Sequence, residues 1–254
     1  METKFLYRYI SFETFVGMVQ KQALTFVLPS VWEDSHEESP FHQLISKRNT
    51  AIEMAFFVAA HNKTYAQCWS ELAESDAMWR IYAYNNRALR IKVEIDKIAQ
   101  LDNVQAVPVT YSDAPFDCEK FDENALFSSL AYKRTAFIHE KEIRLINQYK
   151  YKDEKDAKQH ITAVLIQHGQ QEHAKMLDDM FPDMEWEEKI ENLLKLLNLG
   201  NNRMETKDIS YSHIPEFVNG VMVHPLAPEW YVEVVQEFCK RNNIPFEGKS
   251  KLYS

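Results

Sequence analysis

The chain has 254 residues, 45% hydrophobic and 13% aromatic, so it is long enough to bury a core and too apolar for a disordered segment. Its five glycines form neither a G-x-G-x-x-G nor a G-x-x-x-x-G-K-[ST] pattern, which argues against a phosphate site on a Gly-rich loop. The net charge of −9 disfavours non-specific nucleic-acid binding, because such a surface repels phosphate.

The N-terminal part of the chain predicts strands and helices in alternation. Residues 4–10 are rich in aromatic and branched side chains, which is typical of a strand. Ser11 is a suitable N-cap for a helix over 12–22. The elements predicted next are a strand at 24–28, an acidic loop at 30–40, a helix at about 41–61, a strand at 65–70 and a short helix around 78–82.

The remaining elements follow the same mixed pattern. They are strands at 88–93, 104–111, 141–148, 209–211, 218–223 and near Lys251, helices at 123–137 and 228–241, and a helical turn at 96–101. Residues 154–199 are rich in Gln, Glu, Lys and Leu and predict a helical insertion broken at Phe181-Pro182. Because strands and helices do not alternate as regular βαβ units, we expect a single α+β domain over residues 1–254.

The thiols and the apolar runs indicate the compartment. Cys68, Cys118 and Cys239 are widely spaced and form no C-x-x-C pair, which is typical of reduced thiols in a cytosol. The first residues lack the apolar run of a signal peptide, and the longest apolar run, 54–60, is too short to span a bilayer. We therefore expect a cytoplasmic protein without a membrane partner.

An arginine in the first predicted strand is the first candidate for chemistry. Arg8 shares a strand face with the apolar Leu6 and Ile10. Arginine is rarely buried without an anionic partner, and its guanidinium binds phosphates and carboxylates bidentately. Arg8 is therefore either an anion-binding residue or one half of a structural salt bridge.

Two glutamates and a serine are the other candidates. If the backbone is extended, Glu140 and Glu142 point the same way, about 6–7 Å apart. Carboxylates in different environments can divide the tasks of charge stabilisation and deprotonation, although a solvated edge is the simpler explanation. Ser70 ends a predicted strand, where its hydroxyl would orient a ligand or a carboxylate or cap a turn.

Other charged groups are weaker candidates. The acidic loop with Asp34, Glu37 and Glu38 is either a metal site or a solvated loop. His139-Glu140 does not continue into H-E-x-x-H, because position 143 is Ile. A local basic patch for a nucleic-acid acceptor would be formed by Lys47, Arg48, Arg87 and Arg90.

The order of these pieces resembles a known enzyme class. The segment Leu6-Tyr7-Arg8-Tyr9-Ile10-Ser11, followed by a helix and a hydrophobic strand, is similar to the opening of cholera-toxin-like and pertussis-toxin-like ADP-ribosyltransferases. That family uses Arg, Ser and Glu in this order, with the Glu last in an E-x-E; here these would be Arg8, Ser70 and Glu142, with Glu140 first in the E-x-E. Its Ser-Thr-Ser motif is replaced here by Cys68-Trp69-Ser70.

Most of the chain also resembles a bacterial domain-of-unknown-function family, number 2971. The residues that carry this resemblance are Leu6 to Tyr9, the loop from Pro29 to Glu37, Ser70 with Met78, Trp79 and Tyr82, the stretch from Lys133 to Arg144 with its E-x-E-x-R, and Val218 to Pro228. The family's loop usually contains Asn-Asp-Pro, whereas this chain has Glu33-Asp34-Ser35.

The resemblance to the transferases implies a fold, a cofactor and roles. The fold would be an ADP-ribosyltransferase-like split β-sandwich, and NAD would be the substrate. Arg8 would bind the NAD phosphates, Ser70 would orient Glu142, Glu142 would stabilise the positive ribose centre, and Glu140 would deprotonate or align the acceptor. Further cofactor contacts would come from Tyr7 and Ser11 of the opening motif and from the rings of Trp69, Trp79 and Tyr82.

Three functions follow from the sequence. The first is an NAD-dependent mono-ADP-ribosyltransferase, a toxin or antiphage effector that modifies a protein or a nucleic acid and has an antitoxin or chaperone partner. The second is an NAD glycohydrolase on the same scaffold. The third is a non-enzymatic nucleotide-binding or protein-interaction module, for which the insertion at 154–199 would supply a docking element.

Overall fold

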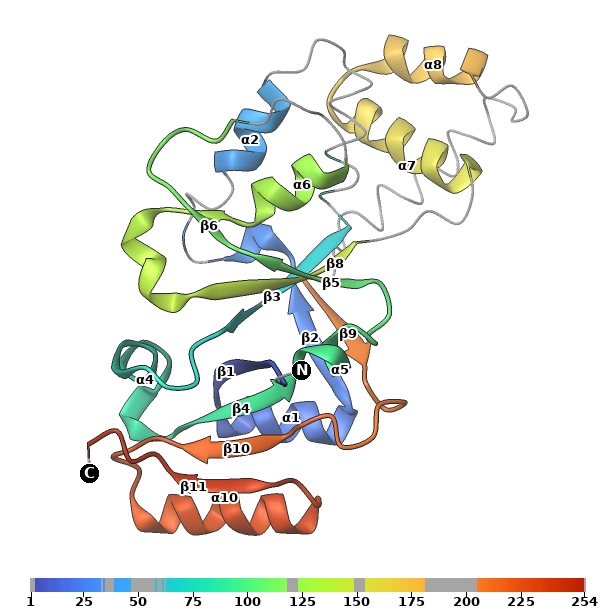
Figure 1. Cartoon of the computed structure of the whole chain (residues 1–254). Helices are drawn as coiled ribbons and strands as arrows, with labels where there is room; N and C mark the ends of the chain where they lie inside the picture. Colours follow the sequence, from blue (N-terminus) through green and yellow to red (C-terminus); the bar gives the residue numbers. More distant parts are fainter. Residues whose placement is uncertain are drawn as a thin grey trace.

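The computed structural model describes residues 3–32, 34, 39–46, 58, 61, 63–117, 123–148, 154–180 and 205–253 (Figure 1). Within these residues the chain mixes helices with strands that pair almost entirely antiparallel, which confirms the predicted α+β class. No described helix combines the length and apolar character that crossing a bilayer requires.

Outside the central region, the strands and helices follow the predicted order. The strands are β1 (Phe5–Ser11), β2 (Ala23–Val27), β3 (Thr64–Ser70), β4 (Ala88–Glu94), β5 (Val104–Pro108), β6 (Thr110–Tyr111), β7 (Tyr132–Lys133), β8 (Glu142–Gln148), β9 (Thr206–Ser210), β10 (Gly220–Val223) and β11 (Phe246–Lys249). The helices are α1 (Phe12–Lys21), α2 (Ser39–Ser46), α4 (Asp76–Tyr82), α5 (Ile95–Ile98), α6 (Glu123–Leu130), α7 (Glu154–Gln167), α8 (Gln171–Met180) and α10 (Glu229–Arg241). The 3-10 turns are η1 (Pro29–Val31), η3 (Tyr84–Asn86) and η4 (Thr135–Glu140).

The described strands form one large sheet and a small one. In the large sheet the order is β11-β10-β4-β1-β3-β2-β9, and β8 adds β5 alongside β3. The pair β10–β11 is parallel, and the other pairs of this sheet are antiparallel. The small sheet is the parallel pair β6–β7.

The contact between β1 and β3 divides the large sheet into two groups of strands. Strand β1 pairs with β4 along its whole length, and β3 pairs with β8 along its whole length. By contrast, β1 and β3 share the single residue pair Tyr7 and Ser70. Figure 1 shows β4, β10 and β11 in the lower half of the molecule and β5 and β8 above them. A short junction of this kind leaves room for side chains between the diverging strands.

Apolar side chains of both groups fill the space behind this junction. The main core takes Leu6 and Ile10 from β1, Trp69 from β3 and Ile143 from β8, together with α1 and α10. A second core packs α2 and α6 against the opposite face of β3 and β8. Strand β8 is therefore buried on both faces, and its polar residues Glu142, Arg144 and Asn147 are buried together with its apolar ones.

Two predicted elements are wrong in the central region. The strand predicted at 104–111 is two strands, β5 and β6, that belong to different sheets and are separated at Val109. The helix predicted at 123–137 ends at Leu130, and the chain continues as β7 and η4. In both places tertiary pairing overrides a local pattern that fits a longer element.

Within the segment predicted as a helical insertion, the described part is helical. Helices α7 and α8 pack on each other through Ile161, Leu165, Ala174 and Leu177. The first break falls at Gly169, whose φ of 72° ends α7, rather than at Phe181-Pro182, which lies outside the described residues. The later part of the helix predicted at 41–61 also lies largely outside them, whereas α2 covers its start.

The N-terminal predictions are confirmed in detail. The Ser11 Oγ accepts a hydrogen bond from the Thr14 backbone N–H at 3.2 Å and so caps α1. Leu89, Ile91 and Val93 of β4 face the main core, as their alternation predicts. Arg90, on the other face, is nevertheless buried, because it is ion-paired with Glu247 and also donates to the Ala73 carbonyl.

We expect Gly220→Ala to destabilise the fold. A Cβ at position 220 would lie 2.7 Å from the Glu247 side chain, whose carboxylate pairs with Arg90 and Lys92. Moving that carboxylate would disrupt both ion pairs, at a cost of about 1–3 kcal/mol in the free energy of unfolding measured with urea. The matched control is Gly17→Ala in α1, where no atom lies within 4 Å; there we expect a gain of about 0.5–1 kcal/mol. Equal effects at the two positions would contradict this account.

Candidate active site

A cavity of about 140 Å³ lies at the junction of β1 and β3. Three strands meet there in register, because Tyr7 pairs with Ser70 and Ser70 pairs with Glu142. The cavity is lined by Tyr7, Arg8 and Tyr9 of β1, Cys68, Trp69 and Ser70 of β3, Met78 and Tyr82 of α4, Glu140 of η4 and Glu142 of β8. Residues more than 130 positions apart in the sequence, such as Arg8 and Glu142, therefore line one cavity.

Most of the residues singled out from the sequence meet here. Those that line the cavity are Tyr7, Arg8, Trp69, Ser70, Tyr82, Glu140 and Glu142. Ser11 does not line it and caps α1 instead. Trp79 does not line it either: the ring is fully buried, lies 4.7 Å from the Tyr9 ring and donates its indole N–H to Glu74. Trp79 is therefore a core residue in this structure.

The Arg8 guanidinium faces the cavity and makes no ion pair or hydrogen bond with the described residues. The side chain is half-buried, and its burial lowers the pKa of Arg8 to about 10, while nearby Cys68 and Tyr82 offset part of that shift. Arg8 therefore stays charged at neutral pH. A desolvated cation that lacks a protein anion is suited to bind an anionic group of a ligand.

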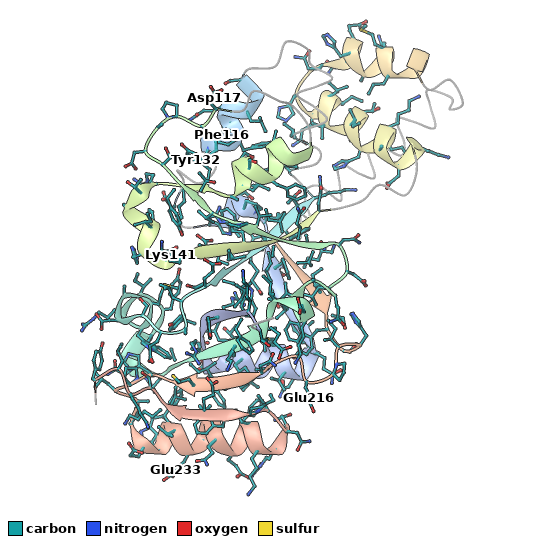
Figure 2. All side chains as sticks on the ribbon, in the orientation of Figure 1. Phe116, Asp117, Tyr132, Lys141, Glu216 and Glu233 are labelled. Atoms are coloured by element: carbon teal, nitrogen blue, oxygen red, sulfur yellow. The ribbon has the colours of Figure 1, made fainter. Side chains whose placement is uncertain are left out.

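The two glutamates reach the cavity in a way that the sequence did not predict. They are not two residues of one extended strand, because Glu140 ends η4 and Glu142 begins β8. Between them Lys141 adopts the left-handed conformation with φ 44° and ψ 52°, and Figure 2 shows it at the bend before β8. This bend turns both carboxylates toward the same buried ammonium, that of Lys133.

Two buried cations hold the glutamates. The Lys133 Nζ donates to Glu140 Oε2 at 2.7 Å and to Glu142 Oε2 at 3.1 Å. The Arg144 Nε donates to Glu142 Oε1 at 2.9 Å, and Arg144 also donates to the Leu130 carbonyl. The Arg144 guanidinium lies 4.2 Å from the centre of the Trp32 ring and is fully buried. Such closely bonded charges tolerate burial because each has opposite charges beside it.

The two carboxyl groups differ in pKa. Burial raises the pKa of Glu140, and the bond from Lys133 offsets this effect only in part. Burial also acts to raise the pKa of Glu142, but Arg144, Lys133 and the Cys68 thiol together lower it to about 2. Glu142 is therefore the permanently ionised member of the pair, and Glu140 is the member that takes up a proton more readily.

The Ser70 hydroxyl supports the turn that carries the glutamates. It donates to the Glu140 backbone carbonyl at 2.6 Å and accepts from the Leu72 N–H at 3.0 Å. The Ser70 hydroxyl is therefore bonded to the backbone of η4. The resemblance implies that it orients the Glu142 carboxylate, but it makes no hydrogen bond with that group. The backbone N–H of Glu142 is held instead by the Tyr111 hydroxyl at 2.8 Å.

The remaining aromatic candidates lie at different depths. Trp69 is buried and donates its indole N–H to the Gln67 side chain at 2.8 Å. The Tyr82 side chain is 42% exposed and lies at the rim of the cavity. Burial of its hydroxyl and the nearby Glu140 raise the pKa of Tyr82. Tyr82 is thus the ring that a ligand entering from solvent would meet first.

Three residues of the site were not singled out from the sequence. Arg144 shares a strand face with Glu142, so the alternation of the predicted strand contained the signal for it. Cys68 is two residues before Ser70 on the same strand; the sequence showed it as a thiol and as part of Cys68-Trp69-Ser70, without a role in the site. Lys133 begins the stretch from Lys133 to Arg144 noted from the sequence, but it fell within the helix predicted at 123–137 and was given no role in the site.

A second cavity of about 350 Å³ lies beside Lys133 and is lined by Asp34, Pro40, Gln43, residues 112–116 and residues 132–134. Its charged groups are already paired. Asp34 bonds Arg134 at 2.9 Å, and Asp113 accepts from the backbone N–H and hydroxyl of Thr135. Figure 2 shows Phe116 and Tyr132 on neighbouring segments of this region. It is larger than the first cavity but lacks a free charge among its described residues.

Other charged candidates are not assembled into a site by the described residues. Asp34 is bonded to Arg134, and Glu37 and Glu38 lie outside the described residues. The proposed basic patch is wrong at Arg90, which is buried against Glu247, and Lys47 and Arg48 lie outside the described residues. Cys68 and Cys239 form no disulfide within the described residues, and Cys118 lies outside them.

Comparison of the chain with protein-family models, with curated proteins and with solved structures finds no match. The resemblance noted from the sequence therefore rests on the motifs of this chain. The site must be judged on its own geometry.

We expect Glu142→Gln to lower stability in a pH-dependent way. Because the pKa of Glu142 falls from an ordinary 4.5 to about 2 on folding, the ionised carboxylate stabilises the fold above pH 4.5, and this contribution disappears as the pH falls toward 2. The loss at pH 7 should be about 3 kcal/mol and should shrink steadily below pH 4.5, as measured by urea unfolding at several pH values. The control is Glu233→Gln, an exposed residue on α10 (Figure 2). A loss that is the same at pH 7 and pH 3 would contradict the assignment.

Proposed function

We propose that this chain is an NAD-dependent mono-ADP-ribosyltransferase with an ADP-ribosyltransferase-like split sandwich, acting as a toxin or antiphage effector. The observation that carries the proposal is that Arg8, Ser70, Glu140 and Glu142, chosen from the order of sequence motifs, line one cavity at the split between two groups of strands. The cavity thus holds a guanidinium that makes no ion pair with the described residues and two carboxylates whose pKa values shift in opposite directions.

Glu142 supplies the charge that the reaction requires. Cleavage of the nicotinamide–ribose bond creates a positive, oxocarbenium-like ribose centre. A carboxylate that is ionised and already fixed stabilises such a centre without reorganising in the transition state. Glu142 meets this requirement, because its pKa of about 2 keeps it charged and bonds from Lys133 and Arg144 fix its position.

Glu140 is suited to handle a proton. Its raised pKa makes it a better base than an ordinary carboxylate once it is ionised, and it lies in the same cavity as Glu142. It would take the proton from the acceptor as the acceptor attacks the ribose carbon and nicotinamide leaves.

The size of the cavity limits which part of NAD it takes. Pockets that hold a whole drug-sized ligand measure about 300–1,000 Å³. A cavity of about 140 Å³ has room for the nicotinamide end, with Trp69 and Tyr82 as its aromatic neighbours. The diphosphate would then lie at Arg8, and the adenosine would extend along the surface.

The same small cavity favours one alternative acceptor. Water fits beside Glu140 in a space of about 140 Å³ more readily than a side chain of a macromolecule does. NAD glycohydrolysis, in which water attacks the ribose carbon and ADP-ribose is released, is therefore the second candidate.

We expect the purified protein to release nicotinamide from NAD and Glu142→Gln to slow this release by about 10²-fold or more.

Arg8→Lys keeps the charge but loses the bidentate geometry, so KM for NAD should rise by about tenfold with a smaller change in kcat. Both are measured by chromatography of nicotinamide, with Glu233→Gln as the matched control and circular dichroism to confirm folding.

A second measurement distinguishes transfer of ADP-ribose to a macromolecule from its transfer to water. Labelled NAD is incubated with the protein and a bacterial lysate. Label bound to macromolecules, sensitive to proteinase or to nuclease, supports the transferase and identifies the acceptor class, whereas label found only as free ADP-ribose supports the hydrolase. If the wild-type protein neither binds nor consumes NAD in the lysate, the enzymatic proposal is wrong.

A further inference from the structure

Lys133 occupies a position between the two cavities. It belongs to the short strand β7, which pairs with β6 outside the large sheet. It lines the cavity of about 350 Å³, while its ammonium reaches the two glutamates that line the cavity of about 140 Å³. Its side chain is 8% exposed and lies over the Phe137 ring at 4.6 Å.

The two glutamates depend on Lys133 to different degrees. Arg144 bonds Glu142 through Nε and Nη2, so Glu142 keeps a cation when Lys133 is removed. Glu140 receives its ammonium bond from Lys133 at 2.7 Å. Loss of Lys133 would leave two buried carboxylates near each other, and Arg144 would be the one cation among the described residues bonded to either of them.

The other groups around the pair do not replace this charge. Three neighbouring side chains cannot supply a positive charge, because thiols and phenols are never cationic. They are Cys68 and Tyr82, which line the cavity, and Tyr111, whose hydroxyl bonds the Glu142 backbone. Arg8 lines the cavity from β1 without a bond to either carboxylate, and His139 lies next to Glu140 in η4, where its ring is bonded to the Ala136 carbonyl. Two carboxylates that share a site without enough positive charge retain a proton between them.

We propose that Lys133 is a positioning residue that holds Glu140 and Glu142 ionised side by side, so that one carboxylate stabilises the ribose cation while the other accepts a proton. The proposal rests on the proposed function, because only a reaction at this cavity would use both charges at once. Lys133 itself does not line the smaller cavity and acts through the glutamates.

The first arm of the test does not require activity. The protein is labelled with 13C at the glutamate carboxyl carbons, and the titration of Glu140 and Glu142, assigned with Glu140→Gln and Glu142→Gln, is followed by NMR. In Lys133→Met we expect the titration of Glu140 to move to higher pH by at least one unit, which corresponds to about 1.4 kcal/mol. Lys133→Arg should restore most of the wild-type titration. Titrations of Lys133→Met that coincide with those of the wild type would overturn the proposal.

The second arm uses NAD turnover. In Lys133→Met, kcat should fall by about 10²-fold, the acidic limb of its pH profile should move to higher pH, and KM should change less than threefold. A purely structural role for Lys133 would lower the amount of active protein without moving the pH profile, and that result would overturn the positioning role. A wild-type protein without NAD turnover would overturn the proposed function while the NMR arm still reports on Lys133.

A double variant keeps the test decisive if Lys133→Met does not fold. Lys133→Met/Glu140→Gln removes one charge of each sign, so it should fold and show Glu142 ionised as in the wild type. Failure of the double variant to fold, or an upward shift of the Glu142 titration in it, would show that Lys133 acts in another way and would overturn the proposal.

Discussion

The junction of β1 with β3 organises the molecule around one residue pair. Strand β3 is bound along its length to β8, and β1 along its length to β4, so the two groups of strands would be separate sheets without the pair of Tyr7 and Ser70. A third strand adds Glu142 to the same row. Because the strands diverge from this row, side chains on both of them face a common space. The cavity is a direct result of that geometry.

Burying charged groups at this junction costs desolvation free energy, and the structure offsets this cost by placing opposite charges next to each other. Lys133 and Arg144 balance Glu140 and Glu142, and every distance among the four groups given above lies within bonding range. Buried ion clusters contribute little net stability compared with apolar residues of equal size, because desolvation offsets most of the attraction. Under the proposed function, these charges are present for their role in the cavity and not for stability. Arg8, which has no such balance among the described residues, points to the same conclusion.

The left-handed residue Lys141 links backbone conformation to this chemistry. A continuous strand through 140–142 would have placed both carboxylates on one face of β8, at the spacing of alternate residues. The bend at Lys141 instead moves Glu140 to the end of η4, and the Ser70 hydroxyl holds its carbonyl there. The carboxylates therefore approach one ammonium from two elements. Strain at such a residue is stored where the surrounding contacts fix it, which is frequently at a functional site.

The sequence by itself determined the α+β class, the N-cap at Ser11, the face of β4 that enters the core, and the choice of Arg8, Ser70, Glu140 and Glu142. The first three follow from side-chain periodicity and capping chemistry, which are local properties, whereas the four candidate residues were chosen from the order of motifs that resembles a known enzyme class. Only the tertiary structure decided that β5 and β6 are separate strands, that the predicted helix after Leu130 gives way to β7, and that Lys133 and Arg144 clamp the glutamates. Those features depend on pairing between segments far apart in the chain, and no local pattern records which partner a strand end or a buried charge will meet.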